Sequence, residues 1–407
     1  MKLLICTPTY TLHGGVERIL EALARGLPPR GIEVVFALAR GARFHDPDRF
    51  RAVFPPIASV DVDGTTGTAY GRQKALRRAI EAVDPDAVLI ARMFDAYPVS
   101  SALKRSGHRL RLITTIQSYE PDYFADLRRY RAFVDLCVAS GELIAAEARE
   151  IVPHVVSIPG GVAPASRRVA HGDGPLRLGY VGRLDAQQKR ALDLIPFAAE
   201  LERRGIAFTL DVAGDGPVLE PLREALPRAR FHGWLSTGEL YARVYPELDL
   251  LLHFAAWEGV TIAPREAMVH GVVPVVSRFP GIERERQMID GESALTFPIG
   301  DVAAAADAVA RLDRDRDLLA KLSANAMASQ SGIRSYEGAL DAWASALLAA
   351  VARPARVGEA LPPVKRDSGL LTRLHVPDAI AERIRRVRRR EHNEAGSEWP
   401  HWSGIRD

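Results

Sequence analysis

Residues 251–276 read LLHFAAWEGVTIAPREAMVHGVVPVV, and we expect them to fold as strand, loop, helix and strand. The apolar run from Asp249 to Phe254 is typical of a strand that is buried on both faces of a parallel sheet. A helix is expected to follow Thr261, which can cap it, and to end before Gly271. Pro264 stands near its first turn, where a missing N–H costs little. Residues 272–276 form the next strand, which completes a unit of an α/β sheet.

Two carboxylates in this stretch indicate a ligand site. Glu258 lies in the loop at the carboxyl end of a strand, where open α/β sheets bind ligands. The backbone N–H groups of about Val260 to Ala263 point out of the helix N-terminus and suit a phosphate. Glu266 lies one turn inside that helix, and a carboxylate that accepts from a ligand hydroxyl contributes about 1.5–3 kcal/mol. The alternative is that Glu266 only complements the helix dipole and that Glu258 is solvated.

The spacing of these two carboxylates resembles the Glu-x7-Glu motif of retaining family-four glycosyltransferases. The adjoining Glu-Ala-Met string, Gly271 and the Pro-Val-Val string are similar to that family as well. In the family the second Glu holds the nucleotide ribose, and the first contacts the donor sugar beside the reacting carbon. The resemblance implies these roles for Glu266 and Glu258 respectively. It also implies that the donor sugar or diphosphate meets the backbone of Gly259, Val260, Thr261 and Ile262.

A second motif, Gly182-Arg183-Leu184 followed by Lys189, stands at another expected strand end. Arg183 and Lys189 straddle a strand-to-helix turn, so both side chains can converge on one anion, although a solvated charge pair is the alternative. The string resembles the family's diphosphate clamp, which stabilises charge on the leaving group in the transition state. Arg190 is the alternative to Lys189 in that clamp. Gly182 and Gly233 match substrate-binding positions of the family, where backbone groups of the Gly233 loop meet the base.

The first half of the chain opens with a strand, a glycine-rich loop, a helix and a second strand. Gly14 and Gly15 let the backbone approach a ligand at a helix N-terminus, although a structural turn is the commoner role of a bare Gly-Gly pair. The string His-Gly-Gly-Val-Glu-Arg resembles the family's N-terminal loop, which faces the donor's phosphates and sugar. Gln117 stands where many members place a His that faces the sugar, and His13 is the nearest other His. The string Ile-Gln-Ser-Tyr-Glu-Pro is similar to a subset that includes bacterial rhamnosyltransferases.

Composition limits the classes to which the chain can belong. Its 407 residues predict two large domains, and contents of 47% hydrophobic and 26% charged residues are typical of a soluble globular protein. The net charge of +3 gives no nucleic-acid signature. Cys6 and Cys137 lie in apolar runs and are expected to be buried, reduced thiols of a cytoplasmic protein. No signal peptide and no membrane-crossing run are recognisable.

The motifs divide the chain into two domains and a tail. The expected parts are an N-terminal Rossmann-like domain on the acceptor side (1–163), a linker (164–175), a C-terminal nucleotide-sugar-binding domain (176–334), a helix that crosses back to the first domain (335–352) and a basic tail that is partly helical or disordered (353–407). In the tail, Ile380, Ile384 and Val387 share a helical face beside arginines. A solvated tail is the plainer expectation, and the alternative is a helix that lies on the anionic inner face of the membrane.

The resemblance implies the GT-B architecture, an α/β fold of two Rossmann-like domains that face each other across a cleft. The implied reaction is retaining transfer from a UDP-, dTDP- or GDP-linked sugar to a hydroxyl of a carbohydrate, glycolipid or small-molecule acceptor. Arg183, Lys189 and Glu258 are the expected catalytic residues, and the family's front-face route lets the departing phosphate help to deprotonate the acceptor. No Asp-x-Asp string lies near these residues, so neither a metal ion nor another cofactor is expected.

Several contexts fit this reading. Synthesis of a bacterial cell-surface polysaccharide or glycoconjugate is the first expectation, and secondary metabolism is an alternative. A sugar-nucleotide epimerase or a phosphorylase has the same fold, but the first would need acid/base groups in the first domain and the second a longer chain with pyridoxal phosphate. A non-catalytic partner that binds a sugar nucleotide or another transferase is the rival from another class. It would be favoured by loss of either cation or either Glu, and all four are present.

Overall fold

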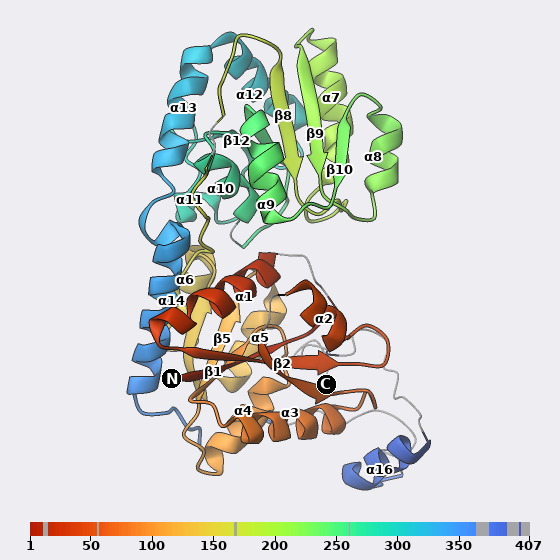
Figure 1. Cartoon of the computed structure of the whole chain (residues 1–407), viewed down its shortest axis with the longest axis vertical. Coiled ribbons are helices and arrows are strands. Elements are labelled where there is room, and N and C mark those ends of the chain that lie inside the picture. Colours follow the sequence, from red (N-terminus) through yellow and green to blue (C-terminus); the bar gives the residue numbers. More distant parts are fainter. Residues whose placement is uncertain are drawn as a thin grey trace. The chain divides into compact units, whose positions relative to one another are not determined.

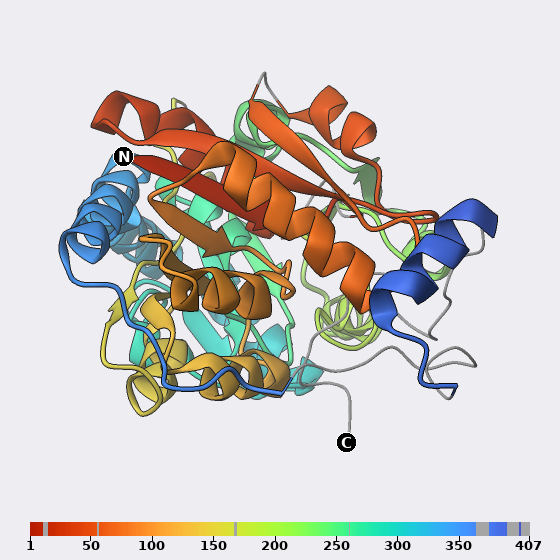
Figure 2. The same cartoon turned by 90° about the horizontal axis from the view of Figure 1, so that it is seen from below.

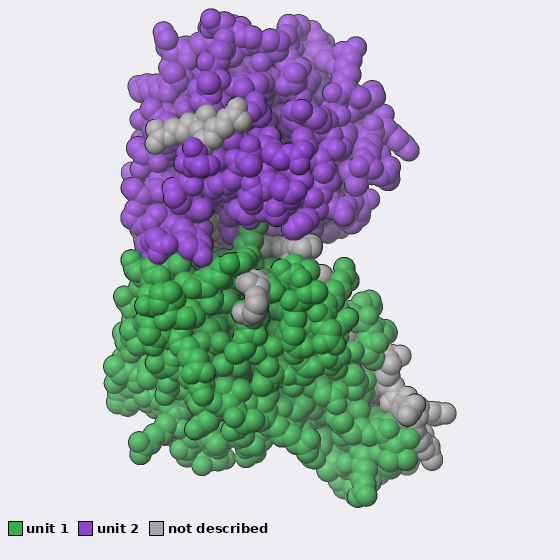
Figure 3. Space-filling view, viewed as in Figure 1, with its two compact units in different colours: residues 1–140, 144–158, 340–407 green, residues 141–143, 159–339 purple. Residues whose placement is uncertain are grey.

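The computed structural model describes residues 1–10, 15–54, 57–166, 169–259, 261–363, 374–388 and residue 399. The chain forms two compact units, which Figure 3 shows in different colours. Unit 1 comprises Met1–Ser140, Ile144–Ile158 and Leu340–Asp407, and unit 2 comprises Gly141–Leu143 and Pro159–Ala339. The chain therefore leaves unit 1, builds most of unit 2 from one continuous stretch, and returns to unit 1.

Unit 1 is built on a seven-stranded parallel sheet with the order β3-β2-β1-β4-β5-β6-β7 (Figure 1). This order reverses between β1 and β4, as in Rossmann-type sheets. Ile5 of β1 pairs with Phe36 of β2 and with Leu89 of β4, and all three are fully buried. The strands are β1 (Lys2–Thr7), β2 (Glu33–Arg40), β3 (Ala58–Asp63), β4 (Ala87–Ile90), β5 (Arg111–Ile116), β6 (Val134–Ala139) and β7 (Val155–Ser157). The helices are α1 (Gly15–Gly26), η1 (Pro28–Arg30), α2 (Pro47–Val53), α3 (Ala69–Val83), α4 (Ala96–Arg105), α5 (Pro121–Tyr130), α6 (Glu142–Arg149), α14 (Tyr336–Ala352) and α16 (Asp378–Arg388).

Unit 2 is built on a six-stranded parallel sheet with the order β10-β9-β8-β11-β12-β13. The order reverses between β8 and β11, so the carboxyl ends of these two strands form the switch point at which such sheets bind ligands. The strands are β8 (Leu176–Val181), β9 (Phe208–Ala213), β10 (Arg230–Gly233), β11 (Leu250–His253), β12 (Val273–Ser277) and β13 (Leu295–Phe297). The helices are η2 (Ala191–Asp193), α7 (Leu194–Arg203), α8 (Leu219–Ala225), α9 (Thr237–Glu239), η3 (Leu240–Val244), η4 (Tyr245–Glu247), α10 (Ile262–Val269), α11 (Ile282–Glu285), α12 (Val302–Arg314), α13 (Arg316–Ala328) and η5 (Gly332–Arg334).

These sheets confirm the predicted class of two Rossmann-like α/β domains. The stretch 251–276 folds as predicted into β11, α10 and β12, because its apolar strands are buried in the middle of a parallel sheet. Leu250, Leu251 and Leu252 are at most 1% exposed. The buried strands hold the loops after β8 and β11 in fixed places.

The segment between the two Rossmann-like folds packs on unit 2 in its described part. His171 Nδ1 lies 2.8 Å from Asp249 Oδ1, and Arg177 donates from Nη2 to the carbonyl of Ala170 at 2.7 Å. The N–H of Val169 donates to the carbonyl of His270 at 2.8 Å. The described residues of 164–175, which were predicted to form the linker, therefore contact unit 2.

After α14 the chain runs along unit 1, held by arginines. Arg111 donates from Nη2 to the carbonyls of Val351 at 2.9 Å and Arg353 at 2.6 Å. Arg105 donates to the carbonyl of Gly358 at 2.9 Å, and Asp135 accepts from the N–H of Arg356 at 2.7 Å. Guanidinium groups can satisfy several carbonyls at once, so this irregular segment keeps its backbone hydrogen-bonded.

The tail helix α16 docks on unit 1 beside α3, as Figure 2 shows from below. Thr68 donates to a carboxylate oxygen of Glu382 at 2.7 Å, and Arg386 is 3.0 Å from Asp63. Glu382 is only 5% exposed, whereas Val387 is 79% exposed. No helix within the described ranges combines the length and the apolar character needed to span a bilayer.

Candidate active site

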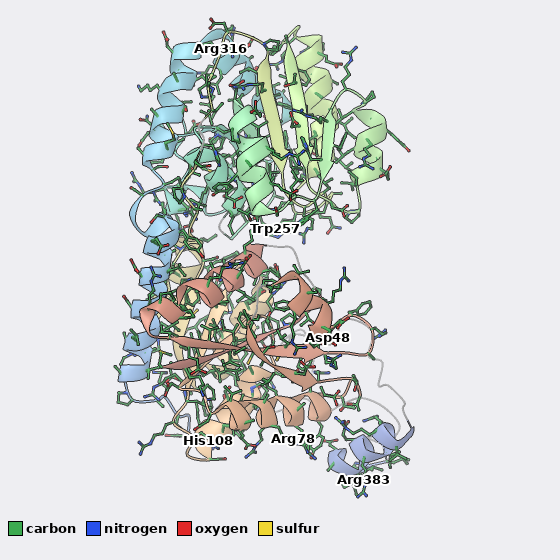
Figure 4. All side chains as sticks on the ribbon, in the orientation of Figure 1. Asp48, Arg78, His108, Trp257, Arg316 and Arg383 are labelled. Carbon is green, nitrogen blue, oxygen red and sulfur yellow. The ribbon has the colours of Figure 1, made fainter. Side chains whose placement is uncertain are left out.

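The candidate site lies at the switch point of unit 2, in the loops that follow β8 and β11. The loops are joined by Gln188, whose carbonyl accepts from the N–H of Ala256 at 2.8 Å. The side chain of Gln188 also donates to the carbonyl of Trp257 at 3.3 Å. Trp257, labelled in Figure 4, marks this end of the sheet. These contacts bring the predicted Arg183–Lys189 and Glu258 motifs into one site.

Glu258 is a buried carboxylate of the site whose pKa is strongly lowered. It is 7% exposed, its Oε1 contacts Lys189 Nζ, and His253 Nε2 lies 3.2 Å from the same oxygen. Burial alone would raise the pKa of Glu258, but the charge of Lys189 and the neighbouring His253 outweigh it and lower the pKa to about 2. Glu258 is therefore a carboxylate at neutral pH, held by one cation. A charged group in a ligand-facing loop, buried and paired in this way, is a functional-site candidate.

His253 was not among the predicted site residues. It is the last residue of β11, 3% exposed, and burial lowers its pKa, so the imidazole is neutral at neutral pH. Its ring also meets Phe279 edge-on, with centroids 6.2 Å apart. A polar residue at the end of an otherwise apolar strand was the available signal. The structure places the ring of His253 beside Glu258 in the buried part of the site.

Arg183 remains accessible at the edge of the site. Its side chain is 60% exposed, and it donates to Asp185 at 2.8 Å and to Gln188 Oε1 at 2.6 Å. The predicted pair does not touch, because Lys189 turns to Glu258 while Arg183 stays with Asp185. Both cations nevertheless stand on one short loop, and Arg183 is the more exposed of the two.

Asp185 is a second residue that the sequence did not reveal. Its Oδ1 accepts from the N–H groups of Gln187 at 3.1 Å and Lys189 at 3.0 Å. Burial would raise the pKa of Asp185, but these bonds and Arg183 outweigh it and lower the pKa. Asp185 thereby folds the loop that carries both cations. Arg190, the alternative to Lys189, instead pairs with Asp193 at 2.8 Å.

Glycine backbones pack closely beneath these side chains. Gly182 donates to the carbonyl of Ala213 at 3.0 Å, and Gly214 donates to the carbonyl of Gly233 at 2.8 Å. A Cβ at Gly214 would lie 1.9 Å from the carbonyl oxygen of Gly182. Gly214 thus packs between the predicted positions Gly182 and Gly233, and a larger residue would clash there. Both predicted positions lie at the carboxyl ends of their strands.

Helix α10 supplies the remaining predicted residues of this unit. Ile262 opens the helix, and Gly259 lies half-buried in the preceding loop. Thr261 occupies the N-cap position, but the expected capping bond is not formed, and its buried Oγ1 has no hydrogen-bond partner among the described residues. The hydroxyl is therefore not used by the first turn of its own helix. Val260 lies outside the described residues.

Glu266 is 3% exposed and accepts from the hydroxyl of Tyr245 at 2.8 Å. Tyr245 lies in η4, and no feature of the sequence pointed to it. The adjoining Arg265 is fully buried, donates to Gln330 at 3.1 Å and to the carbonyl of Arg334 at 2.8 Å, and contacts the carbonyl of Gly160. Burial lowers the pKa of Arg265 to about 10. These bonds fix α10, and with it the carboxylate of Glu266.

The other predicted residues belong to unit 1. Gly15 is the first residue of α1 and is exposed. Gln117 directly follows β5, and its amide contacts Thr115 Oγ1. Gly14 and His13 lie outside the described residues. Gly15 and Gln117 thus share the carboxyl edge of the unit 1 sheet.

The described residues include no cluster of metal ligands and no exposed cysteine. Within these ranges, no group of three or more His, Cys, Asp or Glu side chains is arranged to hold a metal ion. Cys6 and Cys137 are fully buried strand residues, and burial raises the pKa of Cys137 to about 12. Such a thiol is protonated and unreactive at neutral pH.

Comparisons with known proteins match each unit separately. Residues 13–166 match the family model described as Glycosyltransferase Family 4, and residues 175–315 match the one described as Glycosyl transferases group 1. EpsF of Bacillus subtilis is 29% identical over 124 residues, covering 29% of this chain and 32% of that protein. A GDP-mannose-dependent alpha-mannosyltransferase of Corynebacterium glutamicum is 35% identical over 104 residues, covering 26% of this chain and 24% of that protein. The matched regions span about a third or less of these curated relatives.

Solved structures match over most of the chain. HepE of Anabaena in complex with UDP and glucose has a TM-score of 0.68 and 17% identity, covering 86% of this chain and 100% of that chain. The pneumococcal O-GlcNAc transferase GtfA in complex with UDP and GlcNAc has a TM-score of 0.72 and 12% identity, covering 87% of this chain and 99% of that chain. At these identities the likeness concerns the fold.

Proposed function

We propose that this chain, which has the GT-B fold and matches a glycosyltransferase family model in each unit, is a glycosyltransferase that uses a nucleoside-diphosphate sugar. The observation that carries the proposal is the buried Lys189–Glu258 pair at the switch point of unit 2, beside the start of α10. A cation, a carboxylate and a helix N-terminus within one pair of loops are what a diphosphate-linked sugar requires.

In this proposal the donor binds through its diphosphate and its ribose. Arg183 and Lys189 contact the diphosphate, together with backbone N–H groups at the start of α10. Glu266, already fixed by Tyr245, accepts from the ribose hydroxyls. Glu258 accepts from hydroxyls of the donor sugar. The base is read by the backbone around Gly233.

The proposed reaction retains the configuration of the sugar. The bond between the anomeric carbon and the diphosphate oxygen breaks, and the acceptor oxygen forms a new bond on the same face. The proton of the acceptor hydroxyl moves to the departing diphosphate, whose negative charge is stabilised by Arg183 and Lys189. These cations take the part that a metal ion has in other transferases, so we propose that no metal is needed.

The donor and the pathway are also part of the proposal. UDP-sugars come first, because HepE and GtfA are in complex with UDP, and GDP-mannose comes second because of the Corynebacterium glutamicum relative. A dTDP-sugar follows from the resemblance to rhamnosyltransferases. The acceptor is a carbohydrate, a glycolipid or a small molecule, and the first setting is synthesis of a bacterial cell-surface polysaccharide or glycoconjugate in the cytoplasm.

A thermal-shift screen of the pure protein against UDP-, dTDP- and GDP-sugars, with Mg²⁺ or EDTA, tests the donor site. Saturation at roughly a hundred times the dissociation constant should stabilise the folded state by about 2.7 kcal/mol. We expect a shift for one nucleotide that EDTA does not change. Glu266→Ala should weaken that binding about tenfold or more, because a charge-assisted bond to the ribose is lost.

The exposed Glu292 of the same unit provides the matched control, Glu292→Ala, which should bind as the wild type does. A well-folded sample that responds to none of the nucleotides would contradict the proposal. It would favour the rival in which the chain is a non-catalytic partner of another transferase.

Contact with a membrane surface is proposed through α16. Its buried face carries Glu382 and Ala381, which leaves Ile380 53% exposed and Val387 79% exposed beside Arg383, labelled in Figure 4. Apolar and basic side chains together favour an anionic lipid surface. We expect Val387→Glu combined with Arg383→Glu to reduce co-flotation with vesicles that contain anionic lipid. Equal flotation of variant and wild type, or equal binding to purely zwitterionic vesicles, would contradict this role.

A further inference from the structure

Helix α10 begins without the hydrogen bond that normally caps a helix. Thr261 is the N-cap residue and has an extended backbone, yet its side chain makes no capping bond. A capping hydroxyl accepts from the N–H of the second or third helical residue. The third residue of α10 is Pro264, which has no N–H, so one of the two possible donors is missing. The hydroxyl of Thr261 therefore stays outside the backbone bonding of its own helix.

The hydroxyl of Thr261 is also buried. The residue is 3% exposed, and Oγ1 has no hydrogen-bond partner among the residues that the structure describes. A buried hydroxyl that makes no hydrogen bond lowers the stability of a fold, so native proteins contain few of them. Thr261 lies in the loop of the candidate site, between Glu258 and the body of α10, and this position suggests that a ligand is the partner.

A second threonine of the chain shows what the same residue does in an ordinary cap. Thr68 is the N-cap residue of α3, and its Oγ1 accepts from the N–H of Gly71 at 2.9 Å. The same hydroxyl donates to a carboxylate oxygen of Glu382 at 2.7 Å. Thr68 is fully buried, and its hydroxyl both donates and accepts. Thr261 has the same place in its helix and makes neither kind of bond within the described ranges.

The start of α10 offers two more donors beside Thr261. The N–H groups of Ile262 and Ala263 are the first of the helix, and such groups have no acceptor within their helix. Both residues are half-buried, so this end of the helix reaches the surface of unit 2. The partial positive charge of a helix N-terminus acts at the same place. Two backbone donors and one hydroxyl therefore stand together, and they suit an anion with several acceptor oxygens.

We propose that the side chain of Thr261 binds phosphate, and that its hydroxyl donates to the phosphate that carries the donor sugar. The inference rests on the proposed function, which assigns only backbone groups of this segment to the diphosphate. A hydrogen bond to a charged phosphate oxygen is roughly twice as strong as one between neutral groups. Binding of the donor thus supplies the partner that the fold does not. The hydroxyl also makes the site selective, because a nucleoside monophosphate lacks the phosphate that it contacts.

The test compares Thr261→Val, which keeps the shape without the hydroxyl, with Thr261→Ser, which keeps the hydroxyl. Calorimetric titration of the full chain uses the nucleoside diphosphate found in the thermal-shift screen, its monophosphate and its sugar nucleotide. Thr261→Val should bind the diphosphate about tenfold or more weakly than the wild type, because one charge-assisted bond is lost. Its affinity for the monophosphate should stay within about threefold, which also shows that the site is folded. Thr261→Ser should bind the diphosphate within about threefold of the wild type.

Thermal unfolding without nucleotide gives an independent measurement, with Thr68→Val as the matched control. Thr68→Val removes a hydroxyl that makes two bonds, so the melting temperature should fall by about 2–4 °C or more, with unchanged nucleotide affinity. Thr261→Val removes a buried hydroxyl that has no partner among the described residues, so its melting temperature should equal or exceed that of the wild type. One substitution should therefore change stability alone, and the other should weaken diphosphate binding without loss of stability.

Each remaining outcome would overturn the inference. If Thr261→Val and the wild type bind the diphosphate equally, the hydroxyl does not contact it. An equal loss for the diphosphate and the monophosphate would indicate a general change of the site, and a loss seen only with the sugar nucleotide would assign the hydroxyl to the sugar. A lowered melting temperature, like that of Thr68→Val, would show that the hydroxyl serves the fold. In all these cases the wild type still binds the nucleotide, whereas a wild type that binds none contradicts the proposed function itself.

Discussion

Replacing Lys189 by Ala is expected to lower kcat/KM for sugar transfer by about 10²- to 10³-fold, because a cation at the leaving group is lost. The same change leaves Glu258 buried without its cation. Removing one partner of a buried ion pair costs about 3–5 kcal/mol, so the free energy of unfolding of unit 2 should fall as well. Initial-rate kinetics with the donor found in the thermal-shift screen measure kcat/KM, and chemical denaturation measures the free energy of unfolding.

A double variant separates the two effects. Glu258→Gln in the Lys189→Ala background replaces the buried charge by a neutral amide, so most of the stability should return while the rate stays low. Lys321→Ala, at an exposed lysine of α13, is the control and should change neither quantity. If Lys189→Ala kept full activity at saturating donor, Lys189 would have no part in leaving-group stabilisation. If stability did not change, the pair with Glu258 would be dispensable for the fold.

Gly214→Ala is expected to destabilise unit 2 by about 3–5 kcal/mol, the range of severe single substitutions. The φ of Gly214 is 152°, and its missing Cβ would lie 1.9 Å from the carbonyl oxygen of Gly182, well inside the 3.0 Å that real Cβ atoms respect. The clashing atom is a backbone carbonyl oxygen, which cannot move aside by rotation of a side chain. The strand end that carries Arg183 must shift instead, so nucleotide binding should fall together with stability.

Gly238→Ala is the matched control, because nothing lies within 4 Å of its added Cβ and α9 tolerates alanine. Thermal unfolding compares the two variants, and hydrogen exchange of the β9 amides locates the effect in unit 2. A Gly214→Ala protein as stable as Gly238→Ala, with unchanged exchange in β9, would show that this contact is not needed.

The sequence predicted individual elements of the sheets, because parallel strands that are buried on both faces appear as apolar runs, and the family resemblance implied their arrangement in two Rossmann-like domains. The run 249–254 predicted β11, and Thr261, the expected cap, is the N-cap residue of α10. Local sequence signals did not predict which partner a side chain bonds to. The capping bond of Thr261 is not formed although the residue type and position suit it.

Contacts between distant residues could not be predicted from the sequence. Lys189 and Glu258 are 69 residues apart in the sequence. The residues next to each of them in the sequence do not indicate whether its side chain is paired or solvated. Their pairing follows from the adjacency of β8 and β11, which only the sheet order fixes. The hydrogen bond from Tyr245 to Glu266 could not be predicted from the sequence either. In unit 1, Trp399 reaches its place beside His45 from the far end of the chain, and no pattern in the tail indicates this.

The return of the chain to unit 1 has a consequence for the order of folding on the ribosome. Unit 2 is nearly continuous in sequence and ends at Ala339, so all its strands are available once that residue has been synthesised. Unit 1 begins first but lacks α14, the arginine-bound segment and α16 until the last part of the chain emerges. Domains usually complete themselves from the N-terminus onward. Here unit 2, which starts second, is the first unit that can fold completely. The surfaces of unit 1 that pack against α14 and α16 stay exposed until those helices are synthesised, and the contacts that cover them join residues very far apart in the sequence.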